Sequence, residues 1–300
     1  MAQLQHGAPA TPANNAQIAP GTRPGAVSLT VADLARSRSF YEQAIGLSAR
    51  EQDSSKVSLA VADGEPLIEL YGDASASPLD RRRTGLFHLA ILVPSRVDLA
   101  LALSRLAAAS WPLDGASDHL VSEALYLSDP DGNGIEIYRD RPREQWPHSD
   151  GRLQMATLPL DLRDLLDELA ERPDQSTELP AGTSIGHVHL QVSELQHSEA
   201  FYSDVLGFDV TVRGYPGALF LSAGGYHHHI GLNTWNSAGG SPPAPGAVGL
   251  RSFELVLPDH AQLEAVLTRI RQANLDSRPS GSGVEVADPS GNRLVLRVGA

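Results

Sequence analysis

Hydrophobic and polar residues follow the same pattern in two distant stretches of the chain. Residues 25 to 47 (GAVSLTVADLARSRSFYEQAIGL) and residues 186 to 208 (GHVHLQVSELQHSEAFYSDVLGF) align without a gap. In each stretch apolar residues first alternate with polar ones, as in a half-buried strand, and then take the spacing of an amphipathic helix. A glycine follows each helix, where a left-handed cap is favoured. The pattern therefore predicts a duplicated strand-helix unit.

A second pair of similar segments lies downstream of the first pair. GLFHLAILVP (85 to 94) matches GLRSFELVLP (249 to 258), and the turn DPDGN (129 to 133) matches DPSGN (288 to 292). Short strand-like segments, such as PLIELYG and GIEIYRD, follow each predicted helix. The chain thus divides into four βαβββ modules of roughly 50 residues each, and the fold class is α+β.

The four modules suggest a division of the chain into two halves. We expect a flexible tail over residues 1 to 22, which are rich in Ala, Pro, Asn and Gln. The N-terminal half then covers residues 23 to 140 and the C-terminal half residues 183 to 300, with two modules in each. The linker over residues 141 to 182 is polar, and its segment LPLDLRDLLDELAE predicts one helix.

Charge and composition restrict the partners of the chain. The net charge is −13, and no run of basic residues is present, which argues against a nucleic-acid surface. No stretch of 18 apolar residues suits a membrane span, and the start of the chain lacks the pattern of a secretion signal, so we expect a cytoplasmic protein. The chain has no cysteine, so a metal ion would be held by nitrogen and oxygen. Small molecules are the expected partners.

Four βαβββ modules with these strands and turns resemble the vicinal oxygen chelate superfamily, which includes glyoxalases, bleomycin-resistance proteins and extradiol dioxygenases. The resemblance covers about residues 25 to 300 and is closest to the two-domain catechol 2,3-dioxygenase group. It implies metal ligands at the start of the first strand and on the last strand of a module. The first-strand positions of the four modules are Ala26, His88, His187 and Ser252, and the last-strand positions are Glu69, Glu136, Gly231 and Val295.

Modules 2 and 3 together supply a complete ligand set in this comparison. His88, Glu136 and His187 are two imidazoles and one carboxylate, the set that suits non-haem Fe(II), with Mn(II) as the alternative. Modules 1 and 4 offer only Glu69. We therefore expect one metal site, formed where modules 2 and 3 pair to make one half-open barrel while modules 1 and 4 make the other. Pairing across a homodimer is the alternative geometry.

Residues 117 to 136 (SDHLVSEALYLSDPDGNGIE) resemble the extradiol dioxygenase signature. His119, Tyr126 and Glu136 occupy its histidine, tyrosine and glutamate positions, and Ser117 is the one departure from it. The turn and the glutamate also occur in glyoxalases and in binding proteins of the superfamily. His119 and Tyr126 are the residues that favour a dioxygenase, and the resemblance gives them roles in catalysis.

The run GYHHHIGLN (225 to 233) supplies a further histidine. If the run is one strand, His227 and His229 share a face and His228 lies on the other. His229 is two residues before Gly231, so we expect it to face the metal cavity; the resemblance gives it the role of a histidine that handles protons near dioxygen. We expect structural or surface roles for His227 and His228. His189 is a candidate neighbour of the metal ligands, and Phe87, Tyr215 and Trp235 are candidate walls for an aromatic ring.

The resemblance and the ligand set together imply extradiol cleavage of catechol or a substituted catechol, with O2, to a muconic semialdehyde. Two other classes stay open. A glyoxalase-like lyase or isomerase would usually need a fourth side-chain ligand, which Gly231 cannot supply. A non-enzymatic binding protein would need neither the metal ligands nor the pair His119 and Tyr126.

Overall fold

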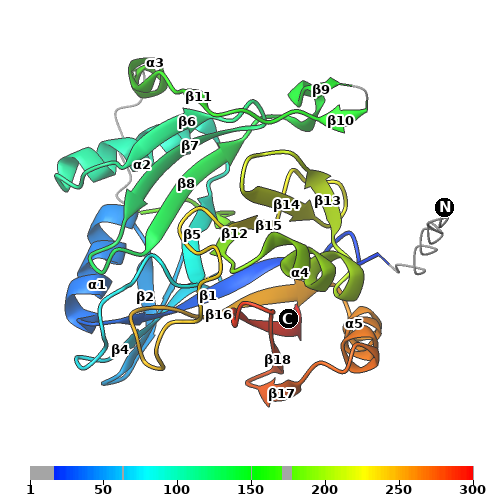
Figure 1. Ribbon diagram of the computed structural model, residues 1–300. Coiled ribbons are helices and arrows are strands. Elements are labelled where there is room, and N and C mark those ends of the chain that lie inside the picture. The colour runs from blue at the N-terminus through cyan, green and yellow to red at the C-terminus, as the bar shows by residue number, and fades with distance from the viewer. Residues whose placement is uncertain (1–16, 63, 150, 171–177, 300) are drawn as a thin grey trace.

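Two large sheets carry the fold, and each is built from two modules (Figure 1). The structure is a computed structural model of the 300-residue chain and describes residues 17–62, 64–149, 151–170 and 178–299. The first sheet joins modules 1 and 4 in the strand order β17 (Ser277–Ser280), β18 (Gly283–Ala287), β19 (Arg293–Val298), β16 (Gly249–Leu257), β1 (Arg23–Val31), β4 (Pro66–Gly72), β3 (Lys56–Ala60) and β2 (Ser48–Gln52).

The second sheet joins modules 2 and 3 in the same way. Its strand order is β11 (Leu158–Pro159), β6 (Gly115–Asp118), β7 (Ser122–Ser128), β8 (Gly134–Asp140), β5 (Gly85–Leu92), β12 (Ser184–Gln191), β15 (Ile230–Asn233), β14 (Ala218–Ser222) and β13 (Asp209–Val212). The α+β fold of four modules and the pairing of module 2 with 3 and of module 1 with 4 are therefore confirmed, and both pairings form within one chain.

The first strands of paired modules meet in the middle of each sheet. β1 pairs with β16, and β5 pairs with β12, both in the antiparallel sense. Each of these strands runs parallel to the last strand of its own module, β4, β19, β8 and β15 respectively. β1 and β12 are buried almost throughout because the central strands of the two sheets also pack on one another. The polar residues that alternate with apolar ones in β1, Ser28 and Thr30, are small and are buried as well.

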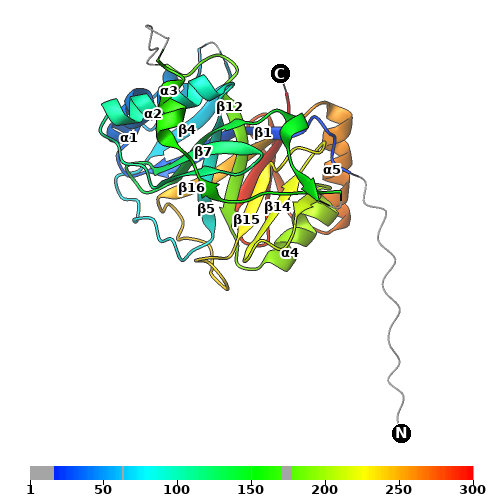
Figure 2. The same ribbon diagram turned by 90° about the horizontal axis from the view of Figure 1, so that it is seen from above.

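The helices gather at the two ends of the molecule (Figure 2). α1 (Leu34–Phe40), α2 (Arg96–Ala108) and α3 (Leu162–Asp167) lie at one end, and α4 (Leu195–Glu199) and α5 (His260–Gln272) lie at the other. Three helices are preceded by N-cap residues: Asp33 before α1, Ser95 before α2 and Asp259 before α5. Each cap side chain accepts a hydrogen bond from a backbone N–H of the first helical turn. α1 and α4 continue into the π-helical turns Tyr41–Ile45 and Ala200–Val205.

The segments outside the modules add short elements to this frame. The predicted linker contains a 3-10 turn (Arg143–Gln145), the ribbon of β9 (His148–Ser149) and β10 (Arg152–Leu153), and α3, which is the helix expected there. Residues 1 to 16 of the predicted tail lie outside the described residues. Ile18, in contrast, is buried, and its N–H donates to Gly207 O at 2.8 Å, so the packed chain begins before residue 22. None of the helices in the described ranges is both long and apolar enough to cross a membrane.

Two buried tyrosines connect consecutive modules. The hydroxyl of Tyr41, in the π turn of module 1, donates to Asp129 Oδ2 in the turn of module 2 at 3.2 Å. Tyr202 in module 3 donates to Asp288 Oδ2 in module 4 at the same distance. These hydrogen bonds join modules 1 to 2 and 3 to 4, whereas the sheets join 2 to 3 and 1 to 4. All four modules are thereby linked in a closed circuit.

We expect Tyr202→Phe to lower the free energy of unfolding by about 1–2 kcal/mol, because a buried carboxylate loses one charged hydrogen bond while its other donors remain. Urea denaturation measures the change. Tyr215→Phe is the matched control, because its hydroxyl contacts the exposed Thr157, and a change within about 0.5 kcal/mol is expected. Equal stability of the two variants would contradict a structural role for the Tyr202 hydroxyl.

Candidate metal centre and active site

The register of three central strands places the predicted ligands on one face of the second sheet. Glu136 on β8 lies opposite Ala90 on β5, and His187 on β12 lies opposite the same alanine on its other side. His88 is two residues before Ala90, so its side chain points to the same face. The small side chain of Ala90 leaves room between the larger ones. The structure thus brings His88, Glu136 and His187 together from strands that are neighbours in the sheet.

The donor atoms of these three residues converge. His88 Nε2 and His187 Nε2 are 3.3 Å apart, and each lies 3.0 Å from Glu136 Oε2. All three residues are buried. A metal ion with bonds of about 2.1 Å at right angles has donor atoms about 3.0 Å apart, so the spacing fits a first-row divalent ion. Two imidazoles and one carboxylate are also the donor set such an ion takes in non-haem iron sites.

The protonation state of the group suits a metal ion as well. Burial alone raises the pKa of the Glu136 carboxyl, but the imidazoles of His187 and His88 outweigh this effect and hold the pKa well below its usual range. Burial lowers the pKa of His187 to about 4, although Glu136 opposes the change. At neutral pH Glu136 is a carboxylate and His187 a neutral imidazole, the forms in which these groups bind metal ions.

The corresponding positions of the first sheet hold a different arrangement. Its one candidate ligand, Glu69, accepts from Lys56 Nζ at 2.6 Å, from Ser28 Oγ at 2.9 Å and from Tyr71 OH at 3.2 Å. A lysine on the carboxylate occupies the place where a cation would bind. Within residues 17–62, 64–149, 151–170 and 178–299, the three residues of the second sheet are the one group of histidines and acidic residues with converging donor atoms.

Modules 2 and 3 differ at one pair of facing positions. Where module 2 has Ala90 opposite Glu136, module 3 has His189 opposite Gly231. A Cβ atom at Gly231 would lie 2.8 Å from Cγ of the His189 ring, so a side chain at position 231 would collide with the ring. His189 itself is buried beside His88, with ring centroids 4.9 Å apart. The ring of His189 therefore fills the space that a fourth ligand from position 231 would need.

His119 and Tyr126 meet across the hairpin of β6 and β7. His119 Nδ1 lies 2.7 Å from Ala156 O, and because a carbonyl only accepts, Nδ1 carries the proton. Nε2 of the neutral ring is then free to accept from Tyr126 OH at 2.6 Å. Burial, followed by the charge of Glu136, raises the pKa of Tyr126 well above its ordinary value, so its hydroxyl keeps its proton.

The histidine run does not lie as the strand pattern predicts. His228, and not His229, lines the cavity, and its ring centroid is 4.1 Å from that of His187. His229 stacks on Tyr226 outside the cavity, and its Nδ1 accepts from Ala223 N–H at 3.1 Å. Burial, followed by His227, lowers the pKa of His229 to about 3. The orientation predicted for His229 is wrong.

The reason for this error is the position of the strand. β15 begins at Ile230, so the three histidines belong to the loop before it, where the two-residue alternation of a strand does not apply. Gly224 and Gly225 both have positive φ, +59° and +69°, and turn the chain sharply after β14. The glycine pair just before the histidines was the sequence signal that the segment is not one continuous strand.

The three candidate ligands line a cavity of about 230 Å³. Its walls include Phe87, Tyr215 and Trp235, as the sequence suggests, and Ser117 also lines it. Sequence reasoning missed other lining residues: Ser122, Met155, Ala156, Thr157 and Phe220. Three of them come from the linker, which β11 holds against β6 at the edge of the sheet. Because the linker belongs to no repeat, aligning the modules gives no sign of its position.

Comparisons with known proteins agree with this fold and site. A family model described as the Glyoxalase/Bleomycin resistance protein/Dioxygenase superfamily matches residues 23–137 and 184–296. The chain belongs to this superfamily. It is 43% identical over 272 residues to a protein of Bacillus subtilis (strain 168) named catechol-2,3-dioxygenase, covering 89% of this chain and 94% of the relative.

Solved structures show the same fold at low sequence identity. A putative dioxygenase from Bacillus subtilis subsp. subtilis str. 168 superposes with a TM-score of 0.64 at 13% identity, over 94% of this chain and 86% of the other. Glyoxalase I from Zea mays superposes with a TM-score of 0.56 at 17% identity, over 92% of each chain. These similarities extend to proteins with different chemistry, so the residues of the site must indicate the reaction.

We expect His187→Ala to reduce bound Fe(II) or Mn(II) from about one ion per chain to nearly none, because the two ligands left are too few to hold the ion. Elemental analysis after desalting measures the metal content. His197→Ala, which alters an exposed histidine paired with Glu194, is the control and should retain the metal. Full metal retention in the His187 variant would contradict the ligand assignment.

Proposed function

We propose that this protein is a metal-dependent extradiol dioxygenase that opens the ring of catechol, or of a substituted catechol, with O2. The observation that carries the proposal is the convergence of two kinds of group on one cavity: the ligands His88, Glu136 and His187, and the proton-handling groups His228 and the pair His119 and Tyr126. The named activity of the relative that is 43% identical supports the same reaction class.

Fe(II) is the metal that this reaction class favours, and Mn(II) has the same ligand preference. His88, Glu136 and His187 would hold the ion, and three protein ligands would leave it able to bind the diol and O2 as well. When bound, the metal would supply the redox step between the diol and O2.

The protein side chains would manage the protons of the substrate. His228, whose ring lines the cavity beside His187, can accept a proton from a ring hydroxyl. The Tyr126 hydroxyl, which is protonated and is held by His119 Nε2, can donate to a substrate oxygen that gains negative charge. Phe87, Tyr215 and Trp235 would pack against the ring.

The cavity favours a small uncharged diol. Its volume of about 230 Å³ is below the roughly 300–1,000 Å³ of pockets for drug-sized ligands, which suits a single ring. Among the described residues that line it, none is a lysine or an arginine. A ring that carries a carboxylate would therefore lose its hydration without gaining a partner of opposite charge.

The features of the site argue against the other two functional classes. A glyoxalase-like lyase or isomerase would usually need a fourth side-chain ligand, and the corresponding position is Gly231, covered by the ring of His189. A binding protein that only sequesters a small molecule would need neither the buried ligands nor the hydrogen bond between His119 and Tyr126.

The direct test is oxygen uptake by the iron-loaded protein with a panel of diols. We expect uptake with catechol and with methyl-substituted catechols, and a kcat/KM at least about tenfold lower for catechols that carry a carboxylate, because an unpaired buried charge costs more than 1.4 kcal/mol. Product absorbance identifies ring opening. Metal binding without oxygen uptake on any diol would contradict a dioxygenase and favour a lyase or a binding protein.

The assignment of His228 predicts a sharp contrast between neighbouring residues. His228→Gln should slow turnover about 10²- to 10⁴-fold, the usual loss when a general acid or base is removed, with metal content unchanged. His229→Gln is the matched control because it changes the same residue type one position further along, outside the cavity, and it should retain nearly full turnover. If the His229 variant is the inactive one, the role assigned to His228 is wrong.

A further inference from the structure

A chain of hydrogen bonds runs from the cavity to the surface behind it. His228 Nδ1 lies 2.8 Å from His227 Nδ1, and His227 Nε2 lies 2.9 Å from Asp140 Oδ1. His227 is fully buried, whereas the Asp140 side chain is 26% exposed. Asp140 ends β8, the same strand that carries Glu136. The chain therefore connects the end of a ligand strand with the histidine that lines the cavity.

The direction of each hydrogen bond follows from the carboxylate. An ionised carboxylate only accepts, so Nε2 of His227 carries a proton and donates to Asp140. A neutral ring then has no proton on Nδ1, so His227 Nδ1 accepts and His228 Nδ1–H donates. A proton on both nitrogens of His227 would reverse this bond, and the tautomer of His228 in the native chain distinguishes the two arrangements.

We infer that Asp140, acting through His227, fixes His228 as the Nδ1–H tautomer and so leaves its Nε2 lone pair available to the cavity. This inference rests on the function proposed above, in which His228 accepts a proton from the diol. Nδ1 of His228 is engaged by His227, which leaves Nε2 as the ring nitrogen that can serve the cavity. Asp140 and His227 are thus positioning residues, and His228 is the residue they prepare.

The surroundings hold Asp140 and His227 in this geometry. Tyr226 OH donates to both oxygens of Asp140, at 3.1 and 2.9 Å, and Tyr138 OH then donates to the Tyr226 oxygen at 2.7 Å. A Cβ atom at Gly186 would lie 1.8 Å from the Tyr138 hydroxyl, so the glycine gives this hydroxyl the space to reach Tyr226.

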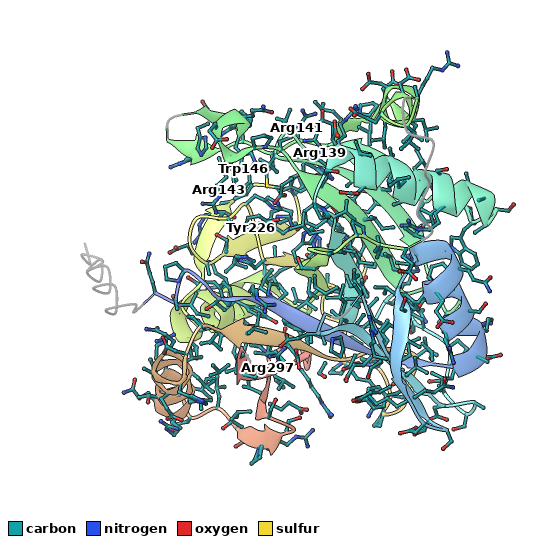
Figure 3. All side chains as sticks on the ribbon, turned by 180° about the vertical axis from the view of Figure 1, so that it is seen from behind. Arg139, Arg141, Arg143, Trp146, Tyr226 and Arg297 are labelled. Atoms are coloured by element: carbon teal, nitrogen blue, oxygen red, sulfur yellow. The ribbon has the colours of Figure 1, made fainter. Side chains whose placement is uncertain are left out.

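An aromatic cover closes the outer side of the network. Trp146 contacts both Tyr226 and His227, with ring centroids 5.9 and 5.4 Å apart, and Arg143 lies over the Trp146 ring (Figure 3). The cover keeps water away from His227, so that Asp140 is the only acceptor within reach of its Nε2 in the described structure.

The tautomer of His228 can be measured directly. Protein labelled with ¹⁵N-histidine and loaded with diamagnetic Zn(II) gives long-range ¹H–¹⁵N correlations that distinguish Nδ1–H from Nε2–H, and His228→Gln assigns the signal. We expect Nδ1–H in the native chain. Asp140→Leu, which keeps the branched shape without an acceptor, and His227→Phe, which keeps the ring without nitrogens, should both populate Nε2–H.

Kinetics supply the second readout. In both variants kcat for oxygen uptake with catechol should fall about 10- to 10³-fold, since a general base is then present only part of the time in the required form. The KM for catechol and the metal content should stay nearly unchanged. Asp209→Leu is the matched control, because it makes the same substitution at an exposed aspartate on β13 outside the network, and the native tautomer and kcat should persist.

The outcomes separate this inference from the proposed reaction. An Nε2–H tautomer in the native chain, or an unchanged tautomer in both variants, overturns the inference whatever the activity. If the native chain consumes no oxygen with any diol but the tautomer shifts as expected, the proposed function fails and the positioning by Asp140 stands. The native spectrum decides the matter even if a variant does not fold.

Discussion

The antiparallel pairing of β5 with β12 is the constraint on which the site depends. It places His88, from the first half of the chain, beside His187, which lies 99 residues further along. Both imidazoles face the cavity only in the observed register, because a slip of one residue would turn every side chain of a strand to the other face. Neither half of the chain contains all three candidate ligands, so the proposed metal centre would require both halves to fold together.

Pairing across the halves also makes the linker part of the site. The connection between modules 2 and 3 runs along the edge of the sheet they share, where β11 pairs with β6. Ala156 is thereby held against the hairpin, and its carbonyl determines which nitrogen of His119 carries the proton. A segment that belongs to no module thus influences a residue of the predicted active site.

The sequence was most informative where a repeat could be aligned. The family resemblance implied where ligands lie in a module, and matching the modules located those positions at His88, Glu136 and His187. The strand register agrees with that match because Ala90 and His189 lie opposite Glu136 and Gly231. The fold class and the pairing of modules could be predicted for the same reason. Each depends on regular strands, whose period of two residues is a physical property of the backbone.

Prediction failed where the backbone leaves that regularity. The loop at Gly224 and Gly225 has no fixed period, so alternation could not tell which of the following histidines faces inward. The hydrogen bond from His227 to Asp140 could not be foreseen either, because it joins residues 87 positions apart through a loop. Contacts of this kind depend on tertiary packing and leave no local pattern in the sequence.

The unequal pairs Ala90 with Glu136 and His189 with Gly231 bear on the history of the duplication. Two copies of one module are identical when a duplication occurs. Here they have diverged: in module 2 the larger side chain of the pair is Glu136 on the last strand, and in module 3 it is His189 on the first strand. A carboxylate introduced at position 231 alone would collide with the ring at position 189, while loss of that ring alone would leave a buried void. Neither single substitution gives a well-packed intermediate. A symmetric centre with a ligand from each last strand could therefore be regained only if positions 189 and 231 changed together. No single substitution reverses the divergence of the two copies.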